Sequence, residues 1–148
     1  MNVSKTKTVC LLTEQRIHAV ALDPRGQPVA RVAVDYVIPA TLCHNDDLKS
    51  LAEAIAQSIH ALEADSHNVT LVLPQHWCFC HVLEVQRRGT SKQTLEYAFE
   101  EVLPLPLEEL TCAFAALGSH RVLAVAVPTS PMGKLLQLLE ENGIEVDH

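Results

Sequence analysis

The order in which hydrophobic periodicities follow one another constrains the fold of this chain more than any other feature. Before residue 45, segments rich in β-branched residues alternate with polar turns, which is typical of an antiparallel meander. From Asn45 to Glu63, apolar residues recur every three or four positions, which predicts a helix capped by Asn45 or Asp46. The apolar segment Val69–Leu73 then predicts a parallel strand, central in a sheet. The three predicted meander strands are Thr8–Leu12, Ile17–Asp23 and Val29–Ile38. The first part of the chain is therefore predicted to be β-β-β-α-β.

The second part of the chain predicts β-α-β-β-α. His76–Val85 is expected to be one long strand, followed by a helix with a capping box at Thr90 and Gln93 and a stop at Pro104. The buried stripe of that helix is predicted to be Leu95, Ala98, Phe99 and Val102. Two strands, "LTCAFAAL" and "RVLAVAV", precede a last helix that is capped by Thr129 or Ser130 and ends at Gly143. The predicted subdomains are residues 1–75 and 76–148, the second including a return toward the main sheet. The final "IEV" predicts the start of a further strand and suggests a longer parent protein.

Composition and charge exclude several classes of protein. Of the 148 residues, 48% are apolar, which is ordinary for a globular domain. The net charge of −7, without a basic stripe, argues against a nucleic-acid partner. The N-terminal apolar run is too short for a signal peptide, and no segment reaches the roughly 20 apolar residues of a membrane span. We therefore expect a cytoplasmic domain whose five cysteines are reduced.

The segment "HWCFCH", residues 76–81, is the one candidate metal or redox site. If it is a strand, His76, Cys78 and Cys80 share one face, while Trp77, Phe79 and His81 share the other. Residues two apart on a strand are roughly 6.5–7 Å apart, whereas two thiolates on one zinc lie within about 4 Å of each other. We therefore predict buried cysteines and no metal, and keep a Cys/His metal-binding module as a lesser alternative. A fourth ligand would have to come from Cys43–His44, Cys112 or His120. A redox pair is disfavoured because the chain has no Cys-x-x-Cys at a helix start.

Three phrases carry a resemblance to a known family: "VTLVLPQHWCFCHVLEV", "LEYAFEEVLPLPLEEL" and "RVLAVAVPTSPMGKLLQLLEENGIEV". In them the chain from Val69 to Val146 resembles the type IV pilus-assembly M proteins and the type II secretion L proteins. The resemblance implies an α/β, actin-like (ribonuclease H-like) fold, of which this chain would be the first half. It also implies a cytoplasmic scaffold that works in protein transport or pilus biogenesis at the inner-membrane face.

Nucleotide hydrolysis is not expected, because the hairpin that holds phosphate in this family is degenerate here. Aligned on "IHAV", Leu11 stands at the family's acid, Thr13 at its glycine and His18 at its lysine, and Glu14 replaces a small residue. Glycine lets backbone N–H groups approach phosphate, and a carboxylate organises Mg²⁺. We therefore predict no cofactor and no enzyme activity, with a nucleotide-binding actin-like ATPase as the alternative. A ribonuclease H-type nuclease is disfavoured because "TVCLL" has no carboxylate for its metal ions.

The resemblance implies protein partners: an inner-membrane assembly protein or the hexameric assembly ATPase, with a homodimer left open. We expect the partner to lie as a strand or helix in a groove between the subdomains, against the strand 76–85 and the helix 95–102. The predicted partner-binding residues are Leu83, Val85, Leu95, Phe99, Leu103 and Leu105.

Overall fold

The computed structural model describes residues 6–42, 45–86 and 89–147, and the chain divides into two compact units. Unit 1 contains Met1–Pro74 and Gly133–His148, and unit 2 contains Gln75–Met132. The chain thus leaves unit 1 once, forms unit 2 and comes back, so that unit 2 is an insertion. The segment from Gly133 onward, which the sequence grouped with the second subdomain as its return, belongs to unit 1.

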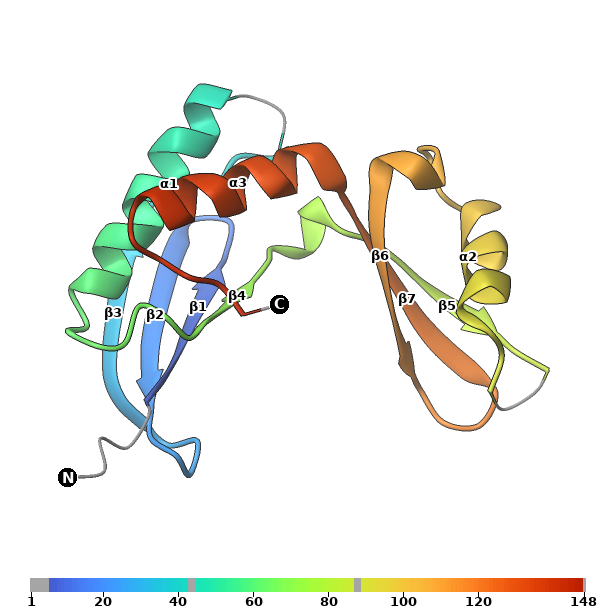
Figure 1. Cartoon of the computed structure of the whole chain (residues 1–148), viewed down its shortest axis with the longest axis horizontal. Helices are drawn as coiled ribbons and strands as arrows, with labels where there is room; N and C mark the ends of the chain where they lie inside the picture. The colour runs from blue at the N-terminus through green and yellow to red at the C-terminus, as the bar shows by residue number, and fades with distance from the viewer. Residues whose placement is uncertain (1–5, 43–44, 87–88, 148) are drawn as a thin grey trace. The chain divides into compact units, whose positions relative to one another are not determined.

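Unit 1 is built on a four-stranded sheet in the order β3-β2-β1-β4 (Figure 1). The first three strands form the predicted antiparallel meander, and β4 pairs in parallel with β1. β4 was expected to be central, but it lies at the end of this sheet. On its far side, among the residues that the structure describes, Val69 alone forms a bridge, a parallel one to Val146 in the predicted "IEV" segment. The strands are β1 (Lys7–Leu12), β2 (Arg16–Leu22), β3 (Pro28–Asp35) and β4 (Val69–Val72).

The helix α1 (Asn45–His60) covers one face of this sheet. Its predicted apolar stripe is buried, and the strand residues that face it alternate with outward-facing ones, as a one-sided sheet requires. Asp46 and Asp47 lie in its first turn, where carboxylates favour the positive end of the helix dipole. The residue before Asn45, and the Asn45 side chain itself, lie outside what the structure describes, so the predicted cap there stays a prediction. The buried residues of the sheet and of α1 include Cys10, Leu12, Ile17, Ala19, Leu51, Ile55 and Ile59.

The helix α3 (Thr129–Glu141) follows the last strand of unit 2 without a loop and carries the chain back to unit 1. Leu135 and Leu139 are fully buried. Gly143 ends the helix as predicted: its φ is 79°, and the next residue, Ile144, donates its N–H to the carbonyl of Leu139 over 2.9 Å.

Unit 2 contains a three-stranded antiparallel sheet in the order β5-β7-β6, with the helix α2 packed on one face (Figure 1). Its buried core joins Leu83 of β5, Leu95 and Phe99 of α2, and Ala124 and Ala126 of β7, with Leu110 at the start of β6. The elements are the 3₁₀ turn η1 (Gln75–Trp77), β5 (Phe79–Glu84), α2 (Lys92–Glu100), the 3₁₀ turn η2 (Leu107–Glu109), β6 (Leu110–Ala116) and β7 (Arg121–Pro128).

The predicted starts of one strand and one helix in unit 2 are wrong. The expected strand 76–85 begins only at Phe79, because residues 75–77 form η1 and the N–H of Cys78 closes that turn on the carbonyl of Gln75 at 3.0 Å. The N-cap of α2 is Ser91, whose hydroxyl accepts the N–H of Thr94 at 3.2 Å, one residue later than predicted. The helix ends at Glu100, before Pro104.

In the described part of the chain, no helix is long and apolar enough to cross a membrane.

Candidate functional site

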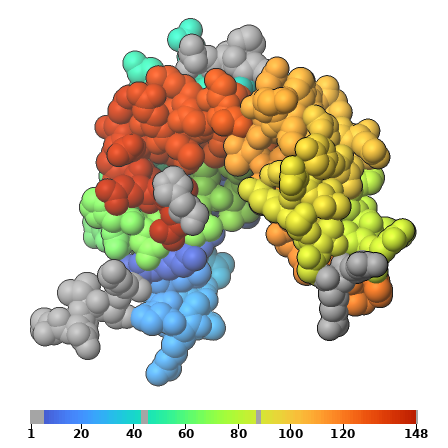
Figure 2. Space-filling view, turned by 45° about the vertical axis from the view of Figure 1, so that its right-hand side comes forward, coloured from blue at the N-terminus to red at the C-terminus, as the bar shows by residue number. Residues whose placement is uncertain are grey.

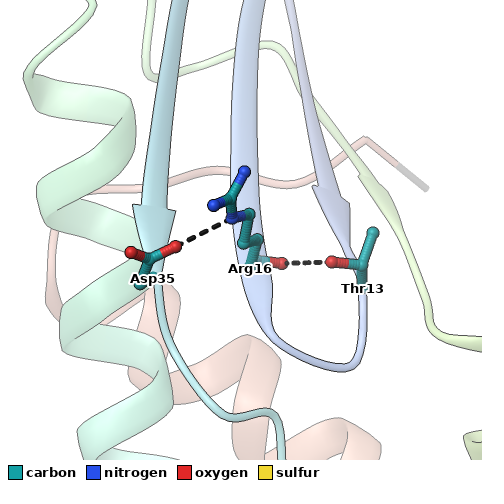
Figure 3. A network of polar contacts seen from close by, with 3 residues as sticks. All are labelled: Thr13, Arg16 and Asp35. Carbon is teal, nitrogen blue, oxygen red and sulfur yellow. Dashed lines mark hydrogen bonds and ion pairs between the residues drawn. The ribbon is translucent and has the colours of Figure 1, made fainter.

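The resemblance predicts a nucleotide site at the hairpin between β1 and β2. Backbone groups of this hairpin form hydrogen bonds within the chain. Thr13 donates both its N–H and its hydroxyl to the carbonyl of Arg16, over 2.9 and 3.0 Å (Figure 3). The carbonyls of the two turn residues, Glu14 and Gln15, accept from N–H groups just after β3, each at 3.0 Å. These hydrogen bonds close the turn and link it to the segment just after β3. The turn contains no glycine.

The charges of this hairpin also do not suit a phosphate. Arg16 donates from Nε to Oδ1 of Asp35 over 2.8 Å, so its charge is already paired (Figure 3). The side chain of Glu14 is exposed at the turn, where it would repel a triphosphate. Leu11 and His18, which align with the family's acid and lysine, are opposite each other across the two strands. The hairpin is a closed structural turn with an exposed ion pair, and such pairs contribute at most about 1 kcal/mol to stability.

The "HWCFCH" segment is not one continuous strand, so His76, Cys78 and Cys80 do not share one face of a strand as expected. Trp77 lies in η1 and is buried, Cys78 is half-buried after that turn, and Cys80 is exposed on β5. The expectation that Cys80 is buried is therefore wrong. Within residues 6–42, 45–86 and 89–147, no three His, Cys, Asp or Glu side chains lie close enough together to hold a metal ion. Cys43 and His44, two of the four named sources of a fourth ligand, lie outside those residues.

The thiols that show a shifted pKa are shifted toward the protonated form. Burial raises the pKa of Cys10 to about 12. Burial, and secondly the neighbouring Cys80, raise the pKa of Cys78; burial, and secondly Glu96, raise that of Cys112. Because a thiolate is the reactive form, these three cysteines are not activated nucleophiles.

The six predicted partner-binding residues all lie in unit 2, but most are core residues. Leu83, Leu95 and Phe99 are 6%, 8% and 1% exposed, and Phe99 packs edge-on against Phe114 with the ring centroids 6.1 Å apart. Val85 and Leu103 are half-buried against the same core. Of the six, only Leu105 is an exposed side chain, at 38%.

Partner binding by these six residues stays a prediction. The buried side chains of Leu83, Leu95 and Phe99 hold unit 2 together and have little exposed surface for a partner. Val85 and Leu95 also line a hollow of about 660 Å³ on unit 2, with Phe114, Val122 and Arg121 on its walls. Partner contact at Leu105, and at the parts of Val85 and Leu95 that reach this hollow, stays a prediction.

The sheet of unit 2 has a second apolar face, turned away from α2, which was missed in the sequence. Strand register places Cys80, Val125 and Ala113 in one row across it, and Val82, Leu123 and Ala115 in the next. These side chains are exposed or half-buried; Val82 is 43% exposed. An antiparallel sheet with one solvated face is normally polar on that face. We call these six residues the open face.

A signal for the open face was present in β7. Its sequence, "RVLAVAVP", has apolar residues at successive positions instead of an alternation, which is typical of a strand that is covered on both sides. Ala124 and Ala126 are fully buried toward α2, whereas Leu123 and Val125 face the other way and are only half-buried. The central strand of unit 2 therefore has the composition of a doubly covered strand, although α2 covers one side only.

Known proteins resemble this chain in structure and not detectably in sequence. No family model and no curated protein sequence matches it. Among solved structures, the cytoplasmic domain of EpsL, an inner membrane component of the type II secretion system of Vibrio cholerae, matches over 97% of this chain and 56% of its own length. That match has a TM-score of 0.63 at 17% identity. A PilM–PilN type IV pilus biogenesis complex matches over 100% of this chain and 47% of its own, with a TM-score of 0.77 at 14% identity.

These matches confirm the predicted resemblance at the level of the fold. The chain shares the mixed α/β fold of both structures along nearly its whole length, and it spans about half the length of either. Both neighbours are components of assembly or secretion machinery by their descriptions.

Proposed function

We propose that this chain is a non-catalytic, actin-like scaffold domain of a type II secretion or type IV pilus-type assembly machine, on the cytoplasmic side of the inner membrane. The fold shared with the EpsL domain and the PilM–PilN complex is the observation that carries this proposal. A scaffold of this kind works by holding protein partners. The proposed partners are the inner-membrane assembly protein or the assembly ATPase of the same machine.

The closed β1–β2 hairpin supports the non-catalytic part of the proposal. Phosphate binding needs backbone N–H groups that point outward from a flexible, glycine-containing loop. Here Thr13 folds its N–H back onto Arg16, and Glu14 adds a negative charge at the turn. Mg-ATP at millimolar concentration is therefore expected to leave the melting temperature unchanged. A saturable rise of several degrees would favour the alternative, a nucleotide-binding actin-like protein.

The open face of unit 2 supports the partner-binding part. It is an uncharged patch on a regular sheet, flanked at one end by the oppositely charged neighbours Glu84 and Arg121. Three strands spaced about 4.8 Å apart, with two rows of side chains, give a patch roughly as wide as one α-helix. A standard protein–protein interface needs about 800 Å² from each partner. We therefore propose that one amphipathic helix of a partner packs here, as α2 does on the opposite side, and that further contacts complete the interface.

A matched pair of variants tests where the partner binds. Val82→Lys places a charge in the open face, and Leu105→Lys places the same charge on the exposed member of the predicted set. Both sites are exposed valine or leucine positions in unit 2, so neither lysine should unfold it. In the assay, two purified proteins of the same organism's machine are titrated onto this chain. One is the ATPase, and the other is the cytoplasmic segment of the inner-membrane protein.

The outcomes separate the two surfaces. We expect Val82→Lys to weaken binding at least tenfold and Leu105→Lys to leave it within twofold. The reverse result would place the partner on the surface that contains Leu105. If neither machine protein binds the unmodified chain, the scaffold assignment itself is wrong.

A further inference from the structure

The strand β3 forms an open edge of the unit 1 sheet. Among the described residues it pairs with β2 alone, and Figure 1 shows it as the outermost strand on that side. Just beyond β3, the N–H groups of Tyr36 and Ile38 still reach the carbonyls of Gln15 and Glu14, both at 3.0 Å. Because backbone direction alternates along an antiparallel strand, residues 30, 32, 34, 36 and 38 point their N–H and C=O groups toward β2. Residues 31, 33, 35 and 37 point theirs outward; before Ala30 a shift in the β2–β3 register interrupts the alternation.

This edge is long and apolar for one that faces water. Val29 and Val37 are 60% and 80% exposed, the two highest values among the exposed valines and leucines. Pro28 blunts the beginning of the strand, but only one cation, Arg31, lies within the edge itself. In Figure 2 the turn between β2 and β3, in light blue, projects from the rest of unit 1. Edges with these properties pair readily with another strand.

We propose that two copies of this chain pair through β3, antiparallel, about a two-fold axis at Ala33. In this register Ala33 lies opposite its own symmetry mate, and the outward backbone groups of residues 31, 33 and 35 find partners. Arg31 of each copy lies opposite Asp35 of the other. The contact is isologous and closes on itself, so it gives a dimer and not a fibre.

The charges select this register over its neighbours. An axis at Arg31 would place the two arginines opposite each other, and an axis at Val32 would place Arg31 opposite Ala33. Only the axis at Ala33 brings both cations to both carboxylates.

The side chains are available for this pairing. Arg31 and Asp35 lie on the same face of the sheet, opposite Val20 and Arg16 of β2. Asp35 is 83% exposed and uses Oδ1 to bind Arg16, so its second oxygen can accept from a second guanidinium (Figure 3). Arg31 forms no ion pair with any residue the structure describes.

Charge-reversal variants of the whole chain test the pairing by sedimentation velocity. Arg31→Asp gives an edge with two acids, and Asp35→Arg gives one with two cations. Each alone should dimerise at least tenfold more weakly than the unmodified chain, because two attractive cross-strand pairs become repulsive. An equimolar mixture of the two variants should form a heterodimer again, since every pair in it is complementary. Circular dichroism of each variant checks that the exposed substitutions leave the fold intact.

A disulfide across the axis tests the register independently. In a Cys80→Ser background, Ala33→Cys is expected to form a covalent dimer on mild oxidation, because directly opposite residues lie about 5.5 Å apart between Cα atoms. Val29→Cys, on the same edge, is the control: its symmetry mates would be roughly 27 Å apart at about 3.4 Å per residue. A chain that is monomeric at high micromolar concentration would overturn the proposal. So would a dimer insensitive to both charge reversals, or equal cross-linking at the two cysteines.

Discussion

Replacing Phe99 by alanine separates a role in the core from a role in partner binding. The ring is 1% exposed, it fills the space between α2 and the sheet of unit 2, and it packs edge-on against Phe114. Removing a buried phenylalanine costs about 3–5 kcal/mol, which includes the lost transfer energy and the cavity. At 0.05–0.15 kcal/mol per residue, a unit the length of unit 2 has only about 3–9 kcal/mol of stability in total. The substitution should therefore remove most of the stability of unit 2 at 25 °C.

The chain contains its own reporter for this experiment. Its single tryptophan, Trp77, is 4% exposed and lies in unit 2, two residues before β5. Urea titration followed by tryptophan fluorescence should show the unit 2 transition of Phe99→Ala moved to a much lower urea concentration. Val102→Ala, at a position that is 49% exposed after the same helix, should move it by less than about 0.5 kcal/mol. If Phe99→Ala keeps the native transition within about 1 kcal/mol and loses only partner binding, the core placement of Phe99 is wrong.

Four further predictions concern single residues. Ser91→Ala should cost about 1 kcal/mol, because it removes the cap of α2, and an unchanged thermal melt would contradict this. Gly143→Ala should destabilise the chain by roughly 1 kcal/mol, because the φ of 79° is strained for a residue with a Cβ, and a neutral melt would contradict this. A thiol reagent at pH 8 should modify Cys80 quickly and Cys10 only after unfolding; early loss of both thiols would show that Cys10 is accessible. Stability should fall as pH rises from about 9 toward 12, because the unfolded Cys10 thiol ionises at its ordinary pKa of 9.0 while the folded one remains protonated; Cys10→Ala should lack this contribution.

Much of the fold could be predicted because each unit 1 element carries its own local pattern. The alternation around Ile17 and Ala19 indicates a strand with one buried side, and the 3.6-residue period from Leu48 to Ile59 indicates a helix. Gly143 marks the end of α3 because the backbone there needs a positive φ. Such signals depend on residues within one or two turns, so they are visible without knowing what lies opposite.

The predictions that were wrong depend on contacts with other segments. "HWCFCH" has the alternation of a strand, yet Trp77 lies in a 3₁₀ turn, where its side chain is buried. In α2, Ala98 has the right spacing for the core stripe but is exposed, since a short helix on a three-stranded sheet buries only Leu95 and Phe99. Local periodicity marks which side chains are apolar, and it does not give the width of the surface that receives them.

The candidate partner surface also depends on contacts between segments and not on local sequence signals. Phe99 and Val82 are both apolar residues in the second half of the chain, and the sequence gives no reason to place one in a core and the other on a surface. That difference arises because α2 covers one face of the unit 2 sheet and leaves the other open, and because β3 is left at the end of the sheet in unit 1. The sequence by itself determined the elements, their order and the absence of glycine from the β1–β2 turn. Only the tertiary structure decided which apolar residues remain accessible, since accessibility depends on which segments pack over them.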